Sequence, residues 1–147
     1  MPLTAARIAQ LQGMPLFGGL TPRTLEVLLR ASRIVDAQAG HVFCEEHAPG
    51  DTFFILEAGQ VEVSKGGPRG RRVLRQLSAG DCFGEMALMD LSPRSATVRA
   101  LCASRALEIP AEALQALYEC DVEQFALLMM NMGREVSRRL RSAGTLE

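Results

Sequence analysis

One short stretch of the sequence, residues 83–98, holds the side chains with the clearest chemistry, and it reads FGEMALMDLSPRSATV. Arg94 lies among small residues, where a planar guanidinium needs an anion and matches two oxygens of a phosphate. Glu85, nine residues earlier, offers a carboxylate that accepts hydrogen bonds from sugar hydroxyls. This pair therefore indicates a site for a ribose phosphate. The alternative is that Glu85 and Arg94 form an internal ion pair.

The backbone around these two residues fits a phosphate site. Gly84 allows a tight turn, and residues 85–89 are good helix formers, so we predict a single helical turn there. The N–H groups at the start of a helix have no partner within it and attract anions. Ser95 and Ala96, which follow a rigid Ser92-Pro93 turn, leave room for a ligand.

The elements that must position this stretch are predicted to be β-strands. Between residues 32 and 110, β-branched and aromatic segments alternate with glycine turns at roughly 8 to 12 residue spacing. We predict strands at 33–36, 41–44, 52–57, 60–65, 73–77, 97–101 and 104–109. Many short strands joined in this way are typical of a sandwich or jelly roll. The predicted fold is mainly β with flanking α-helices: an antiparallel β jelly roll (double-stranded β-helix) with N-terminal helices and a long C-terminal helix.

Helices are predicted on both sides of this β region. Leu3, Ile8 and Leu11 indicate a short amphipathic opening helix, and Thr21 before Pro22 is the expected N-cap of a second helix. Further helices are predicted at 111–120 and 121–141. The expected organisation is a helical lead-in at 1–31, a β-roll at 32–110, C-terminal helices at 111–144 and an expression-vector remnant at 145–147.

The last predicted helix carries a heptad-like apolar stripe made of Val122, Phe125, Met129, Met132 and Val136. Either this stripe packs on the chain's own barrel, or two such helices pair across a homodimer, and the stripe alone does not decide. The helix ends in an arginine cluster: Arg134, Arg138, Arg139 and Arg141. These cations fit a solvated end matched to the helix dipole. No nucleic-acid contact is expected from this chain alone, because no recognition helix or base-stacking aromatics accompany the cluster.

Composition excludes several classes of function. The 147 residues carry 16 basic and 17 acidic side chains, a net charge of −1, which gives no global attraction for nucleic acid or membrane surfaces. No apolar run reaches the ~20 residues of a membrane span, so we expect a cytoplasmic protein without a membrane partner. Four scattered cysteines are expected to be reduced thiols, and His41 and His47 lack metal-ligand spacing. No catalytic constellation stands out. We therefore expect no enzyme, metal or cofactor.

Residues 83–98 resemble the phosphate-binding cassette of the cyclic nucleotide-binding domain family, including the catabolite activator-like sensor domains. The family pattern is F-G-E, an apolar stretch, then P-R, a small residue, A and T/S-V, and the sequence meets every position. The resemblance extends from about Leu16 to Arg141. It implies that Glu85 binds the ribose 2′-hydroxyl and that Arg94 pairs with the cyclic phosphate. The implied ligand-binding residues are Phe83, Gly84, Glu85, Met86, Ala87, Arg94, Ser95 and Ala96.

The resemblance also implies a ligand and a partner. Ser95, where cGMP-binding relatives often carry Thr, favours cAMP over cGMP. In the catabolite activator relatives, polar side chains of the long helix reach the purine, but the matching positions here are Ala143 and Gly144, which offer no side-chain hydrogen bonds. Val136, Leu140 or an arginine stem is then expected to cover the base. The expected function is a cAMP sensor that passes ligand occupancy to its C-terminal helix and to an effector or dimer mate.

Three alternatives stay open at this stage. The first is that the chain is the sensor half of a Crp/Fnr-type transcription regulator, cut before its helix-turn-helix. The second is a scaffold that keeps the fold without binding ligand. The third is a metal-dependent jelly-roll enzyme of the cupin type, because fold alone does not fix function. Its histidine ligands are missing from the sequence.

Overall fold

The computed structural model describes residues 3–142 and contains two compact units. Residues 32–111 form the first unit, called here the β-roll. The two ends of the chain, up to residue 31 and from residue 112, form the second, called here the helical unit.

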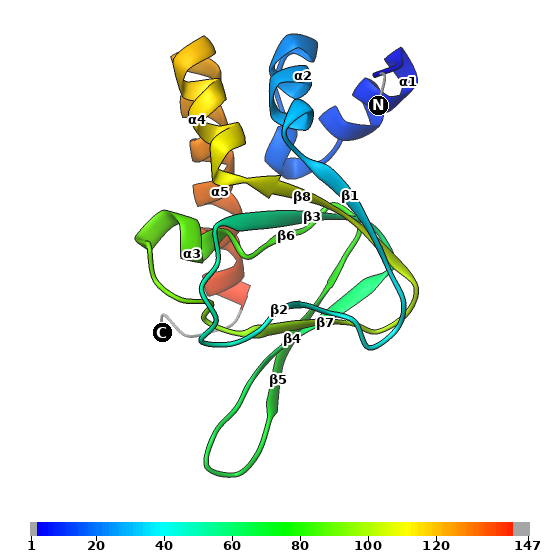
Figure 1. The fold of residues 1–147 in the computed structure, drawn as a ribbon, viewed down its shortest axis with the longest axis vertical. Helices are drawn as coiled ribbons and strands as arrows, with labels where there is room; N and C mark the ends of the chain where they lie inside the picture. Colours follow the sequence, from blue (N-terminus) through cyan, green and yellow to red (C-terminus); the bar gives the residue numbers. More distant parts are fainter. Residues whose placement is uncertain (1–2, 143–147) are drawn as a thin grey trace. The chain divides into compact units, whose positions relative to one another are not determined.

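The β-roll consists of two four-stranded antiparallel sheets, which Figure 1 shows on either side of a common interior. The first sheet has the order β1-β8-β3-β6 and comprises β1 (Arg33–Ala37), β8 (Ser104–Pro110), β3 (Thr52–Ala58) and β6 (Cys82–Phe83). The second has the order β2-β7-β4-β5 and comprises β2 (Val42–Cys44), β7 (Thr97–Ala100), β4 (Gln60–Lys65) and β5 (Arg72–Ser78). The predicted jelly-roll architecture is confirmed.

The core of the β-roll lies between the two sheets. Its buried members come from both: Cys44, Phe54, Leu56, Val61, Leu77, Phe83, Val98 and Ala106. The rings of Phe54 and Phe83 stack with centroids 5.0 Å apart, and Phe43 meets each of them edge-on at 5.5 Å. Aromatic pairs of this geometry stabilise a core beyond their buried area. Phe83 is thereby fixed at the point where the chain leaves β6 for the predicted cassette.

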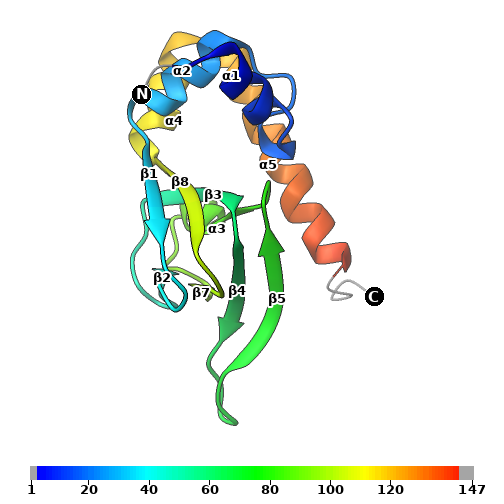
Figure 2. The same cartoon turned by 90° about the vertical axis from the view of Figure 1, so that its right-hand side faces the viewer.

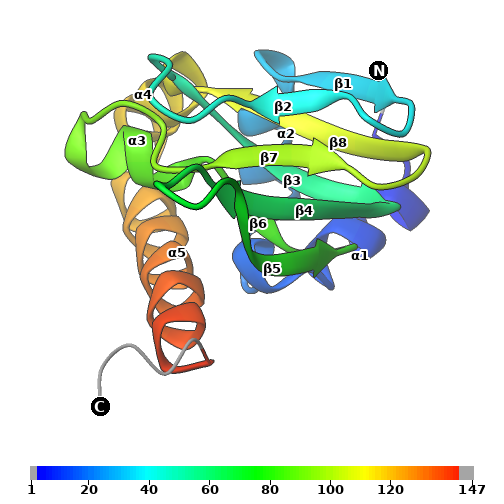
Figure 3. The ribbon, with the colours of Figure 1, turned by 90° about the horizontal axis from the view of Figure 1, so that it is seen from below.

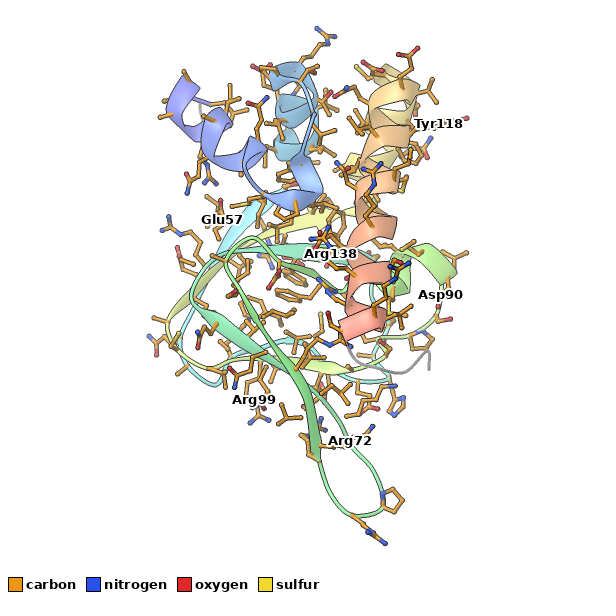
Figure 4. All side chains as sticks on the ribbon, turned by 180° about the vertical axis from the view of Figure 1, so that it is seen from behind. Glu57, Arg72, Asp90, Arg99, Tyr118 and Arg138 are labelled. Atoms are coloured by element: carbon orange, nitrogen blue, oxygen red, sulfur yellow. The ribbon has the colours of Figure 1, made fainter. Side chains whose placement is uncertain are left out.

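Strands β4 and β5 continue beyond the sheets as a projecting hairpin, seen in Figure 2. Their pairing runs from Gln60 opposite Ser78 to Lys65 opposite Arg72, with one register shift after Val63. Figure 4 labels Arg72 on this hairpin.

The helical unit contains α1 (Ala5–Gln12), the 3₁₀-helix η1 (Pro15–Phe17), α2 (Pro22–Arg30), α4 (Ala111–Cys120, whose first residue belongs to the β-roll) and α5 (Val122–Ser142). The expected N-cap is present, since the Thr21 hydroxyl accepts from N–H of Thr24 at 3.2 Å. The side-chain amide of Asn131 on α5 donates to the carbonyls of Leu16 at 3.0 Å and Gly18 at 2.9 Å. This amide ties α5 to the η1 segment.

The heptad-like stripe on α5 is largely turned inward. Met132 is 1% exposed and Phe125, Met129 and Val136 are half-buried, whereas Val122 is 56% exposed. A different set of α5 residues, exposed except for half-buried Gly133, lies at alternating steps of four and three: Ala126, Met130, Gly133, Ser137 and Leu140. Among the described residues, no helix combines the length and the apolar character needed to cross a membrane.

Candidate functional site

The predicted cassette begins where β6 ends. Gly84 adopts φ 83°, a left-handed conformation that glycine takes without strain, and the six-residue helix α3 (Glu85–Asp90) follows. The predicted helical turn is thus present. Figure 3 shows α3 at one end of the strands, and Figure 4 labels Asp90, its last residue.

Arg94, the one basic residue of the stretch 83–98, is 7% exposed, and three hydrogen bonds hold its side chain. Nη1 donates to the carbonyls of Thr52 at 2.7 Å and Gly84 at 2.9 Å. Nη2 donates to the Thr52 hydroxyl at 3.3 Å. These bonds use three of the five guanidinium donors. Nε–H and the second Nη2–H, on one edge of the planar group, stay available for two oxygens of an anion.

Two glycines make this placement of Arg94 sterically possible. A Cβ on Gly50 would lie 2.2 Å from Nε and 2.3 Å from Cζ of Arg94, so the guanidinium occupies the space of an absent side chain. A Cβ on Gly84 would lie 2.7 Å from Nη1. Any larger residue at either position would displace the cation.

The main chain of Arg94 is also fixed. Its N–H donates to the carbonyl of Ala48, and its carbonyl accepts from N–H of His47, both at 2.8 Å. These two bonds therefore fix the loop that carries Gly50 against the loop that carries Arg94.

The other predicted site residues are arranged in two groups. Phe83, Glu85 and Ala87 are buried, with Glu85 only 2% exposed. Met86 is 47% exposed, and Ser95 is exposed next to half-buried Ala96. The Arg94 side chain links its own loop to the start of α3, because the carbonyl that accepts from Nη1 of Arg94 belongs to Gly84, the residue before Glu85.

Cys44 is a buried thiol close to the charged residues of this region. Burial raises the pKa of its thiol to about 11; nearby Arg94 opposes this shift, and Glu85 and Glu108 add to it. The pKa of Cys44 therefore depends on Arg94 and on the carboxylates of Glu85 and Glu108. Within the described part of the chain, no group of three or more His, Cys, Asp or Glu side chains is placed to hold a metal ion.

The sequence identifies the cassette but not the residues outside it that surround Arg94. Gly50, Thr52, Cys44 and Glu108 all lie outside residues 83–98. The one local signal in the sequence is Pro49-Gly50-Asp51, a combination typical of a turn, which indicates a bend but not the guanidinium against it. The positions expected to meet the base, Ala143 and Gly144, lie outside the described residues, as does the expected vector remnant.

Known proteins resemble this chain in sequence. The CRP-like cAMP-activated global transcriptional regulator of Mycobacterium tuberculosis is 28% identical over 127 residues, which cover 86% of this chain and 55% of that protein. The cAMP-dependent protein kinase regulatory subunit of Aspergillus fumigatus is 38% identical over 90 residues, 61% of this chain and 21% of that protein. The chain thus spans about half or less of the length of these relatives.

Solved structures show the same similarity. The catabolite activator protein of Thermus thermophilus superimposes with a TM-score of 0.75 at 28% identity, covering 89% of this chain and 60% of that one. The profile of the cyclic nucleotide-binding domain matches residues 34–121, more than half of the sequence. The chain therefore belongs to the cyclic nucleotide-binding domain family.

Proposed function

We propose that this chain is a regulatory sensor that binds cAMP at the cassette, with Arg94 pairing with the cyclic phosphate. The observation that carries the proposal is the buried guanidinium of Arg94, held by three bonds with two donors left along one edge. A cyclic phosphate diester presents two exocyclic oxygens and one negative charge. Two parallel N–H donors on a cation match that group in both geometry and charge.

Glu85 is the proposed acceptor for the ribose 2′-hydroxyl. Its burial at 2% exposure excludes most water, which strengthens a hydrogen bond made there. The main chain at Gly84, Met86 and Ala87, with Ser95 and Ala96, completes the proposed phosphate cradle. Exposed Ser95 has a free choice of partners, so it supports a preference for cAMP over cGMP only weakly.

Calorimetric titration of the purified protein with cAMP and with cGMP tests this proposal. Arg94→Ala is expected to weaken cAMP binding by roughly 10²-fold, because it removes two charge-assisted bonds. Arg94→Lys is also expected to bind weakly, since it keeps the charge but loses the fork. Arg99→Ala, which removes an exposed arginine on β7, serves as the matched control. Parent protein that gives no heat and no shift in melting temperature with either nucleotide would instead favour the scaffold alternative.

We further propose that ligand occupancy is passed to a second copy of the chain through α5. The supporting observation is the outward stripe of Ala126, Met130, Gly133, Ser137 and Leu140, in which Met130 is 58% and Leu140 41% exposed. A Cβ on Gly133 would meet nothing within 4 Å, so a partner backbone has room to approach there. Heptad spacing with a small central residue suits a paired helix.

Analytical ultracentrifugation with and without cAMP tests the pairing. Met130→Glu places a charge in the proposed interface and is expected to yield a monomer. Val73→Glu, at a 52% exposed position on β5, is the control and is expected to behave like the parent. A parent protein that stays monomeric at all concentrations contradicts the proposal.

A role as the sensing part of a transcription regulator is the wider proposal supported by similarity to the Mycobacterium tuberculosis regulator, of which the matched segment forms 55%. The mass of the native protein in its own cells tests it. A mass near that of the 147 residues would exclude a DNA-binding domain on the same chain.

A further inference from the structure

A chain of hydrogen bonds connects Arg94 to the surface of the β-roll through two residues outside the cassette. The Thr52 hydroxyl accepts from Nη2 of Arg94 at 3.3 Å and donates to Oε2 of Glu108 at 3.0 Å. Oε1 of Glu108 accepts from Nε of Arg33 at 2.7 Å. The Glu108 side chain is 16% exposed and that of Arg33 76%. The bonds therefore lead from the buried cassette to solvent.

The pairing of three neighbouring strands builds this arrangement. Arg33 on β1 lies directly opposite Glu108 on β8. On the other side of β8, Glu108 lies opposite Phe54 and Pro110 lies opposite Thr52. Thr52 is thus a diagonal neighbour of Glu108 on the same face, a separation that side chains bridge.

The direction of each bond follows from the donors available. A threonine hydroxyl has one proton, and because that proton is given to Glu108, its lone pairs face Arg94. Positive and negative charges then alternate along the path from Arg94 through Glu108 to Arg33.

We propose that Thr52 and Glu108 are positioning residues for nucleotide binding, and that Arg33 is a surface position from which affinity at the cassette is adjusted. The proposal rests on the proposed function, because it concerns the edge that Arg94 presents to the phosphate. Thr52 holds the guanidinium by its carbonyl and by its hydroxyl. Glu108 fixes the rotation of that hydroxyl, and Arg33 holds the carboxylate of Glu108.

Substitutions separate this role from simple sheet stabilisation. Thr52→Val keeps the shape but removes the hydroxyl, and it is expected to weaken cAMP binding about 10-fold. Thr52→Ser restores the hydroxyl and is expected to recover most of the affinity. Ser104→Ala removes another buried hydroxyl, on β8, whose partners are the carbonyls of Cys102 and Gln60, and it is expected to leave affinity unchanged.

Coupling between the two positioning residues is tested by a double-mutant cycle. Glu108→Ala alone is expected to weaken binding, and Thr52→Val with Glu108→Ala is expected to be no weaker than the poorer single variant, because both act through one hydroxyl. Arg33→Ala is expected to weaken binding only two- to three-fold, as its side chain is largely exposed. Additive losses, or equal affinity of Thr52→Val and parent, would overturn the proposal.

A second measurement needs no ligand. In the ¹⁵N spectrum of the protein alone, the Arg94 guanidinium protons are expected to exchange slowly with water, and several-fold faster in Thr52→Val but not in Ser104→Ala. Unchanged exchange in Thr52→Val refutes the positioning role, whether or not the protein binds cAMP. A parent that binds no nucleotide but shows the exchange effect would refute the proposed function alone.

Discussion

Replacing Gly50 by alanine is expected to displace Arg94 and weaken cAMP binding while leaving the fold intact. The new Cβ would lie 2.2 Å from Nε, and ordinary contact begins at 3.4 Å, so the guanidinium must move by about 1.2 Å. That shift breaks bonds that now measure 2.7 and 2.9 Å to the carbonyls of Thr52 and Gly84. The available edge of Arg94 turns with it.

The expected magnitudes follow from the bonds affected. Loss of most of two charge-assisted bonds to the phosphate amounts to about 2 to 3 kcal/mol, or roughly 30- to 150-fold in affinity for cAMP. The unfolding free energy is expected to fall by only about 1 kcal/mol. The carbonyls lose a partner, but alanine restricts the unfolded chain and offsets part of that loss.

Calorimetry with cAMP and urea unfolding of the same samples measure both quantities. Gly66→Ala is the matched control, since its Cβ would meet Glu46 and Arg71 only at ordinary distances of 3.6 and 3.8 Å. Gly50→Ala with parental affinity, in a protein where Arg94→Ala binds weakly, would refute the reasoning that this contact sets the position of the cation.

Two further substitutions test the energetics of the fold. The pKa of Cys44 rises from 9.0 to about 11 through burial, so the folded state favours the neutral thiol. The stability contributed by the neutral thiol is fully present below pH 9 and is lost as the pH rises to about 11. Over this range the unfolding free energy is expected to fall by about 3 kcal/mol more in the parent protein than in Cys44→Ala. Parallel curves of unfolding free energy against pH for the two proteins would contradict this. Asn131→Asp directs a carboxylate at the carbonyls of Leu16 and Gly18 and is expected to cost about 3 kcal/mol in urea unfolding at pH 7, whereas a change below about 1 kcal/mol would show that the amide is not what ties α5 to η1.

The sequence pattern predicts the strands well where alternation is strong. Each predicted segment is present with its ends moved by about one residue, as when 73–77 becomes Arg72–Ser78. Strand β6 was missed, since two residues are too few to show a period. Cys82 and Phe83 form a strand because they pair with Ile55 and Phe54 of β3.

The site was predictable only as far as it is local. The F-G-E and P-R spacing identified Glu85 and Arg94, because both lie in one continuous segment. Thr52 and Glu108 are separated from Arg94 by 42 and 14 residues of sequence, and only the pairing of β3 with β8 makes them neighbours. The sequence leaves open what covers the α5 stripe, because periodicity finds an apolar face but does not say whether the chain itself or a partner packs against it. In the structure Met132 is buried and Val122 is 56% exposed.

Hydrogen bonds within the protein leave only one edge of the Arg94 guanidinium available to a ligand, and this limits which nucleotides it can bind well. A side chain already held by its own protein loses little freedom when it meets a ligand, so the site is rigid before binding. The two N–H donors that Arg94 has left match the two free oxygens and single negative charge of a cyclic phosphate diester. A linear 5′-monophosphate carries a second charge and a third terminal oxygen, for which this edge has no donor left. With Arg94 bound to the phosphate as proposed, we therefore expect the site to favour a cyclic diester, which carries one negative charge, over the linear monophosphate formed by its hydrolysis.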